Sequence, residues 1–116
     1  MPTYLIRVSA AARSDVREAL RYSALRFGPA AKVRYAALIA RTLEDISANP
    51  LGAGSRERPE LGDGIIARHL TSSAHASGVN DPRHIIFYRL VGVNVDVLRV
   101  LHDARDLPQH LEGEPR

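Results

Sequence analysis

An arginine and a histidine lie in the last apolar run of the chain, where their side chains could do chemistry. Residues 95–102 read Val-Asp-Val-Leu-Arg-Val-Leu-His, so Arg99 sits inside a β-branched run and His102 at its end. An ionisable side chain in such a place needs a partner for its charge or a functional role. Histidine has a suitable pKa for general acid–base catalysis, and arginine suits an oxyanion.

Further side chains of these types lie on or near two earlier apolar runs, and they are Arg68, His69 and His84. The five histidines of the chain have no metal-ligand spacing, so no metal site is expected. Neither a glycine-rich phosphate loop nor a Ser-His-Asp order is recognisable, and no cofactor is expected.

Each charged candidate also has a structural explanation. Arg89 can lie opposite or diagonal to Asp96 in a hairpin and form a cross-strand ion pair. Arg99 lies farther from the turn and is available to an acidic residue of a partner. His102 is better explained as a hydrogen-bonding residue at a strand end, held by Asp106, than as a catalytic group.

Two helices are predicted from the spacing of apolar side chains. Ser9 can cap the first, Gly28 ends it, and Pro29 can open the second, which runs over residues 30–48 until Pro50 stops it. Helices joined so tightly must be antiparallel neighbours. The side chains expected to face the core are Ala12, Val16, Ala19, Leu20, Ser23 and Phe27 in the first helix, and Tyr35, Leu38, Ile39, Thr42, Leu43 and Ile46 in the second.

Strands are predicted before and after this helical hairpin. Gly92 and Asn94 mark a turn between the last two strands, while residues 51–64 form a loop and residues 71–82 have the composition of a mobile connection. The two helical faces need a sheet to cover, so the fold class is α+β with two layers. The predicted strands are residues 4–9, 65–70, 84–90 and 95–102.

The last two strands are apolar on both faces. A small sheet covered by helices on one side should alternate polar with apolar residues, so the second face must be covered too. The cover is a second copy of the chain, another protein, or the chain's own loop and tail. One face is expected to carry Ile86, Tyr88, Leu90, Val95, Val97 and Leu101, and the other Ile85, Phe87, Leu98 and Val100.

The composition indicates one globular domain. The chain has 116 residues, 45% of them hydrophobic and 25% charged, and we assign residues 1–111 to the domain and 112–116 to a polar tail. Without cysteine, disulfides and thiol catalysis are excluded. No run approaches the roughly 18 apolar residues of a membrane span, and no signal peptide is visible, so a cytoplasmic protein is expected. The charge of +3 comes from arginines, which suit carboxylates and phosphates alike, because Lys32 is the single lysine.

Short apolar segments, each with one polar residue, recur through most of the chain. They are residues 4–9 with Ala12 and Asp15, residues 27–28 with Ala31, residues 50–52, residues 88–90, and residues 98–102 with Asp106. Their order and spacing resemble the RelE/ParE toxin superfamily of type II toxin–antitoxin systems, and most of all its ParE branch. The resemblance implies the order β-α-α-β-β-β, with the helical hairpin packed on a small, mostly antiparallel sheet. Residues 71–83 and the tail depart from the family pattern.

The resemblance implies a toxin of the plasmid-stabilisation type. Such a toxin inhibits DNA gyrase without catalysis, and a cognate antitoxin wraps around it by helix-in-groove or strand-addition binding. No membrane and no sequence-specific nucleic acid is expected as a direct partner. The residues expected to bind a partner are Tyr88, Arg89, Leu98, Arg99, His102 and Arg105.

RelE-type relatives imply an alternative, a ribosome-dependent mRNA endonuclease. Its catalytic groups would be Arg68, His84, Arg99 and His102. The lysine-rich second strand and helix of the RelE type are missing here, as is a tyrosine after the last strand, which favours the gyrase inhibitor. A third possibility is a remnant of the toxin fold with no target, since stability and activity are separable.

Overall fold

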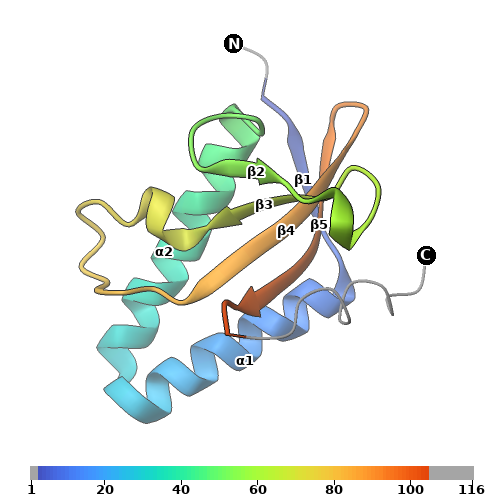
Figure 1. The fold of residues 1–116 in the computed structure, drawn as a ribbon. Helices are drawn as coiled ribbons and strands as arrows, with labels where there is room; N and C mark the ends of the chain where they lie inside the picture. The colour runs from blue at the N-terminus through green and yellow to red at the C-terminus, as the bar shows by residue number, and fades with distance from the viewer. Residues whose placement is uncertain (1–2, 105–116) are drawn as a thin grey trace.

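The chain folds into two layers, a helical hairpin and a five-stranded sheet, with the helices on one face of the sheet (Figure 1). The computed structural model describes residues 3–104. The predicted α+β architecture, with two helices after the first strand and the remaining strands after them, is confirmed. One further strand precedes the predicted three. Among residues 3–104, no helix is long and apolar enough to cross a membrane.

Local signals at the helix ends explain where the hairpin begins, turns and stops. Helix α1 (Ala10–Phe27) is capped by the Ser9 hydroxyl, which accepts a hydrogen bond from the Ala12 N–H at 3.0 Å. Gly28 ends α1 with φ of 95°, a backbone conformation that favours glycine. Helix α2 (Pro29–Ala48) then begins at once. The predicted hairpin is therefore confirmed to within one residue.

The sheet has the strand order β1-β5-β4-β3-β2. β1 runs parallel to β5, and every other neighbouring pair is antiparallel. Two short 3₁₀ helices, η1 (Pro59–Leu61) and η2 (Leu70–Ser73), flank β3. The strands are β1 (Leu5–Val8), β2 (Ser55–Glu57), β3 (Ile66–His69), β4 (His84–Val91) and β5 (Asn94–His102).

A β-bulge in the β4–β5 pair changes which face the end of β5 presents. Tyr88 pairs with Val97 and Phe87 with Arg99, which leaves Leu98 as the extra residue. Because of this residue, Val100 joins Val95 and Val97 on the helix side, while Leu101 turns to the other face. The expected face assignment of Val100 and Leu101 was therefore wrong, since strict alternation ignores a bulge.

Both faces of the sheet carry apolar clusters. The helix-side cluster joins the two helices to β3, β4 and β5, and it includes Leu38, Ile46, Ile86 and Tyr88. The outer cluster lies on the opposite face, where Leu61 and Ile65 pack with the buried residues Ala67, Phe87 and Leu101. The chain's own segment between β2 and β3 thus contributes to covering the second face.

The free edge of β5 is closed by the start of α1. β1 pairs with β5 only as far as Val97. Beyond that point the Ser9 hydroxyl donates to the Leu98 carbonyl at 2.9 Å, and the Asp15 carboxylate accepts from the Val100 N–H at 2.9 Å. These side chains satisfy backbone groups that would otherwise lack a strand partner.

Candidate functional site

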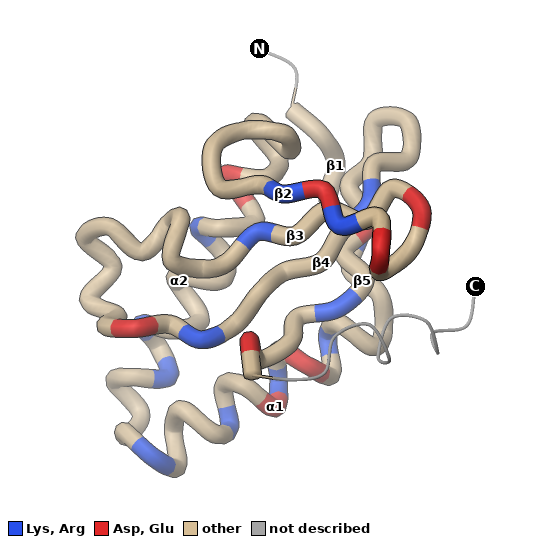
Figure 2. The backbone as a smooth tube through the Cα atoms, in the orientation of Figure 1, with Lys and Arg blue, Asp and Glu red and all other residues tan. Residues whose placement is uncertain are grey.

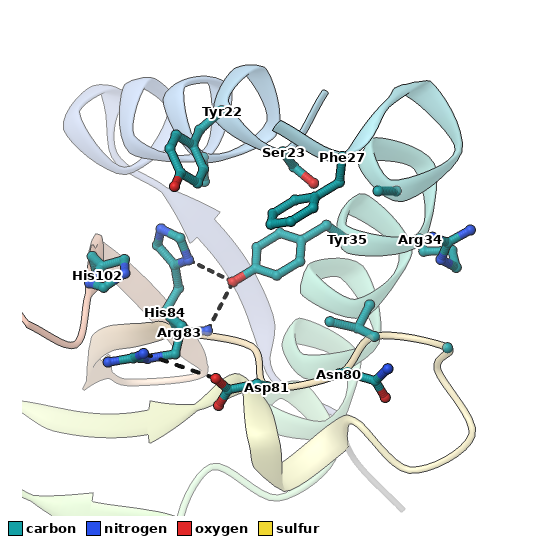
Figure 3. A pocket seen from close by; sticks show the side chains of 14 residues that line it. Tyr22, Ser23, Phe27, Arg34, Tyr35, Asn80, Asp81, Arg83, His84 and His102 are labelled. Carbon is teal, nitrogen blue, oxygen red and sulfur yellow. Dashed lines mark hydrogen bonds and ion pairs between the residues drawn. The ribbon is translucent and has the colours of Figure 1, made fainter. Parts of the chain in front are cut away.

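A pocket of about 530 Å³ opens between the helical hairpin and the ends of β4 and β5 (Figure 3). The hairpin contributes aromatic side chains to its wall, including Tyr22, Phe27 and Tyr35. The sheet contributes His84 from the start of β4 and His102 from the end of β5. Other lining residues come from the segment that precedes β4.

The two histidines meet in the pocket because of strand register and the bulge. His84 pairs with His102 across β4 and β5, and their ring centroids are 5.4 Å apart in an edge-on arrangement. Without the extra residue Leu98, alternation along β5 would turn His102 to the outer face. The bulge therefore places His102 beside His84.

Tyr35 fixes the orientation of His84. Its hydroxyl accepts a hydrogen bond from the Arg83 backbone N–H at 3.3 Å and lies 2.6 Å from Nδ1 of His84 (Figure 3). With one lone pair occupied by that N–H, the hydroxyl hydrogen is free to point at Nδ1 of a neutral His84. Burial also raises the pKa of the Tyr35 phenol, so this hydroxyl keeps its proton.

His84 is neutral at physiological pH. Its burial, and next to that the neighbouring His102, lower its pKa from 6.5 to about 4. In the tautomer whose Nδ1 accepts from the Tyr35 hydroxyl, the single proton of the neutral ring is on Nε2. That tautomer offers the pocket an N–H donor.

His102 has the same tautomer for a different reason. Its Nδ1 accepts a hydrogen bond from the Ala104 backbone N–H at 3.1 Å, so Nε2 of that tautomer carries the proton. The expected strand-end hydrogen bond therefore exists, but with Ala104. Asp106, the partner expected for it, lies outside the described residues.

A second polar group lies beside the pocket and is centred on Asp103. Its carboxylate binds the Arg83 guanidinium at 2.9 Å and Nε2 of His69 at 3.0 Å. The hydrogen bond from Arg83 is the main reason why the pKa of Asp103 falls from 3.8 to about 2. Nδ1 of His69 accepts from the Thr71 N–H, so His69 too is held as an Nε2 donor. Within residues 3–104, no group of three or more histidine, cysteine, aspartate or glutamate side chains could hold a metal ion.

The two arginines of the expected nuclease set lie elsewhere and have structural roles. Arg68 is 4% exposed and donates to the Ser55 hydroxyl and to the Asn49 carbonyl. Arg99 reaches around the edge of β5 to the Asp15 carboxylate at 2.7 and 2.9 Å, with both side chains largely buried. Only His84 and His102 of the set line the pocket.

The residues expected to bind a partner also fall into different environments. Tyr88 has no exposed surface, and its hydroxyl donates to the Pro50 carbonyl at 2.7 Å, so it belongs to the core. The acidic partner expected for Arg99 is Asp15 of the same chain. Leu98 packs against the outer cluster and is partly buried. Arg105 lies outside the described residues.

Arg89 shows how a correct register can still give a wrong contact. It lies directly opposite Asp96, as expected. Its guanidinium nevertheless donates to the Asp63 carbonyl at 3.0 Å. Asp96 instead binds Arg7 of β1, at 2.5 and 2.9 Å. Because β1 is adjacent to β5, its arginine competes for the same carboxylate.

The turn of the helical hairpin adds a basic and apolar surface next to the pocket. Residues 21–34, here called the hairpin tip, contain no acidic residue, and Figure 2 shows only basic positions around this turn. Half of the large apolar side chains that are exposed among the described residues lie in it. Its exposed large apolar side chains are Tyr22, Leu25, Phe27 and Val33, and its exposed basic side chains are Arg21, Arg26, Lys32 and Arg34.

Sequence reasoning missed several residues of this site. Phe27 was expected in the core, yet it is 67% exposed at the rim of the pocket. Tyr35 is expected to face the core, although a hydroxyl in an apolar stripe signals a need for a polar partner. Asp103, the first residue after β5, and Arg83, the residue before β4, were not linked with each other. Because β4 and β5 are neighbouring antiparallel strands, the residue before β4 and the residue after β5 could have been predicted to meet.

The pocket can bind a hydrogen-bond acceptor but is poorly suited to proton transfer. A general base needs a nitrogen with a free lone pair, whereas Nδ1 of His84 and of His102 already accept hydrogen bonds. Of the two guanidinium groups that line the pocket, Arg83 binds Asp103, which leaves only Arg34 to stabilise a phosphate transition state. The arrangement offers hydrogen-bond donors surrounded by aromatic walls.

Comparisons with known proteins agree on one family. Residues 6–107 match the model of the family described as the ParE toxin of the type II toxin–antitoxin system parDE. The chain is also similar to Toxin ParE1 of Caulobacter vibrioides, with 32% identity over 105 residues, which is 90% of this chain and 95% of the relative.

Two solved structures share the fold. A chain from the chromosomal ParDE toxin–antitoxin system of P. aeruginosa has a TM-score of 0.65 at 14% identity, covering 88% of this chain and 98% of that one. A chain from the toxin–antitoxin complex RelBE2 of Mycobacterium tuberculosis has a TM-score of 0.54 at 22% identity, covering 86% and 98%. At these identities the likeness establishes the fold alone.

Proposed function

The chain belongs to the ParE toxin family of type II toxin–antitoxin systems, and on that premise we propose that it inhibits DNA gyrase by binding and is neutralised by a cognate antitoxin. A binding mode of inhibition requires a surface but no proton transfer. The proposed target acts in the cytoplasm, so we place the action of the protein there. Direct sequence-specific contact with nucleic acid is not part of the proposal.

The observation that carries the non-catalytic part is the hydrogen bonding of the two pocket histidines. His84 is neutral with its Nδ1 occupied, and the Nδ1 of His102 is occupied by a backbone N–H. Arg68 and Arg99, which an endonuclease would need for phosphate, are engaged in internal bonds. A ribosome-dependent mRNA endonuclease would have to break these contacts before it could use either arginine or the Nδ1 atom of either histidine.

The antitoxin part of the proposal is supported by the surface of the hairpin tip. Exposed apolar side chains beside exposed cations fit a partner that is both apolar and acidic. Both fold neighbours come from toxin–antitoxin systems. We expect the antitoxin to be a protein whose co-expression restores growth to cells that produce this chain.

Two reconstituted assays test the target. Purified protein added to gyrase and relaxed plasmid should reduce supercoiling, and the inhibition should disappear when the antitoxin is added first. The same preparation added to translating ribosomes should leave the mRNA uncut. Codon-linked cuts in ribosome-bound mRNA, with supercoiling unaffected, would replace the proposal with the endonuclease.

The variant His102→Ala sharpens the choice. Loss of a general acid or base costs about 10²–10⁴ in rate, whereas loss of a strand-end hydrogen bond costs only about 1 kcal/mol of stability. We expect the folded variant to inhibit supercoiling as the parent does. If the parent cuts RNA and the folded variant does not, the enzyme reading stands instead.

A further inference from the structure

We propose that the pocket between the hairpin tip and the ends of β4 and β5 binds one carboxylate, which is carried by an apolar, acidic segment of the antitoxin. This inference rests on the proposed function, because it presupposes an antitoxin. The donors are Nε2 of His84 and Nε2 of His102, and both residues line the pocket.

The hydrogen bonds of the two histidine rings determine what the site can bind. Nδ1 of His102 accepts from the Ala104 N–H, and Nδ1 of His84 lies 2.6 Å from the Tyr35 hydroxyl. With that hydroxyl as the donor, each ring has its N–H at Nε2. A ligand that supplies an oxygen can accept a hydrogen bond from both rings. A ligand that is itself only a donor would find no partner on either ring.

The charge around the pocket favours a monoanion over phosphate. The lining contains two guanidinium groups, Arg34 and Arg83. Arg83 is already balanced by Asp103 at 2.9 Å and has Asp81 at 4.0 Å. Asp81 and Asp103 together offset the charges of the two guanidinium groups, so the surroundings of the pocket hold no surplus positive charge for a dianion. One carboxylate is therefore easier to accommodate than a phosphate dianion.

The surroundings favour a polypeptide over a small molecule. A carboxylate fills only a part of 530 Å³, and the helical hairpin adds Tyr22, Phe27 and Tyr35 to the wall. Outside the pocket lining, the hairpin tip also exposes Leu25 and Val33, at 76% and 67%. A polypeptide with apolar side chains near its carboxylate can cover both. A nucleic acid would use the cations of the tip but would leave these two aliphatic side chains without a partner.

A small-molecule probe tests the carboxylate-binding pocket without gyrase or antitoxin. Phenylacetate, an aromatic monoanion, is titrated into ¹⁵N-labelled protein while the ring nitrogens of His84 and His102 are followed by NMR. We expect saturable shifts at both Nε2 atoms, at least tenfold weaker binding of the neutral phenylacetamide, and no binding of inorganic phosphate at the same concentrations. Tighter binding of phosphate, or no shift with phenylacetate, would overturn the site.

Matched variants show whether the probe uses the proposed donors. His102→Phe keeps an aromatic ring and removes the N–H, and it should weaken phenylacetate binding roughly tenfold or more, as expected for a hydrogen bond to a charged group. His75→Phe makes the same change at an exposed histidine outside the pocket lining and should have no effect. Equal effects of the two variants would contradict the assignment.

A double-mutant cycle connects the site to the antitoxin. Each Asp or Glu of the antitoxin is changed to its amide, and the affinity is measured against wild-type protein and His102→Phe. We expect one carboxylate whose loss weakens binding to the wild type roughly tenfold and has little further effect on His102→Phe. Additive losses at every position would refute the binding of an antitoxin carboxylate in the pocket. Displacement of phenylacetate by a short DNA duplex, but not by the antitoxin, would refute it as well. Neither readout depends on gyrase inhibition.

Discussion

At the scale of single residues, Asp15 joins three parts of the molecule. Its carboxylate binds the Arg99 guanidinium twice and also accepts the Val100 N–H. The side chains of both ion-pair partners are little exposed, at 13% for Asp15 and 14% for Arg99. Removing one member of a buried pair leaves the other charge uncompensated, which costs more than the pair itself contributes.

We therefore expect Asp15→Asn to lower the free energy of unfolding by about 2–4 kcal/mol, because a buried guanidinium loses its counter-charge. Urea unfolding measures this change. Asp96→Asn is the matched control, since its partner Arg7 is 54% exposed in the side chain and an exposed pair contributes about 0–1 kcal/mol. Similar losses in the two variants would argue against the structural role of the Asp15–Arg99 pair.

His84 should make the stability of the protein depend on pH. Its pKa is about 4 in the folded chain and 6.5 in the unfolded chain, so only the unfolded chain takes up the proton between these values. The free energy of unfolding should therefore fall as the pH drops from 6.5 to 4. In His84→Gln, which keeps an acceptor for Tyr35, this part of the pH dependence should be absent.

Unfolding of both proteins in urea across this range provides the measurement. Asp103 contributes in a lower window, because its pKa of about 2 is below the ordinary 3.8, so its stabilisation is lost as the pH falls through 2. Both proteins share that loss. Parallel curves for the wild type and His84→Gln between pH 6.5 and 4 would show that His84 does not resist protonation in the folded chain.

From the sequence, Arg99 and His102 are residues in need of a partner and His84 is a candidate catalytic group, but the sequence could not supply their partners. Tyr35 and His84 are 49 positions apart, and Arg99 and Asp15 are 84 apart. No local pattern links residues at such distances. The sequence therefore predicts a partner for Arg99 outside the chain, because no local pattern shows that α1 lies along the edge of β5.

At the scale of elements, local signals explain both what the sequence predicted and what it missed. Ser9 and Gly28 are caps that act within a few residues, so the helix bounds could be predicted. Strand β2, in contrast, has only three residues and no apolar alternation. Its position depends on the antiparallel pairing of Ser55 with Arg68 of β3, a contact that exists only in the folded chain.

Two glycines in turns should differ in their tolerance of a side chain. Gly92 in the β4–β5 turn has φ of 60°, and an added Cβ would meet nothing within 4 Å. Gly54 has φ of 91°, and its added Cβ would lie 2.7 Å from the Cβ of Ser72. Gly92→Ala should thus cost about 1 kcal/mol from backbone strain alone, and Gly54→Ala clearly more because strain and a steric clash combine.

Thermal and urea unfolding of both glycine variants test this order. The double variant Gly54→Ala with Ser72→Gly removes the atom that clashes and should recover part of the lost stability. A larger loss for Gly92→Ala than for Gly54→Ala would contradict the geometry of both turns.

At the scale of the whole molecule, the two apolar clusters have strands in common. Phe87 of the outer cluster lies between Ile86 and Tyr88 of the helix-side cluster on β4. Leu101 of the outer cluster likewise follows Val100 of the helix-side cluster on β5. Because β4 and β5 carry side chains of both clusters, we expect the two clusters to be lost together. The assignment of residues 1–111 to a single domain is a prediction that this connection supports.

Cooperative unfolding is the consequence that can be measured. Ile46→Ala removes buried carbon from the helix-side cluster and Ile65→Ala from the outer cluster, and each should cost about 2–4 kcal/mol. If the domain is one unit, both variants lower the midpoint of a single transition, and helix and aromatic signals change together in each. Separate transitions in Ile65→Ala, with the helices melting after the outer face, would mean that the outer cluster is an appendage. In that case the segment between β2 and β3 would be a removable cover, and a partner could take its place on the sheet.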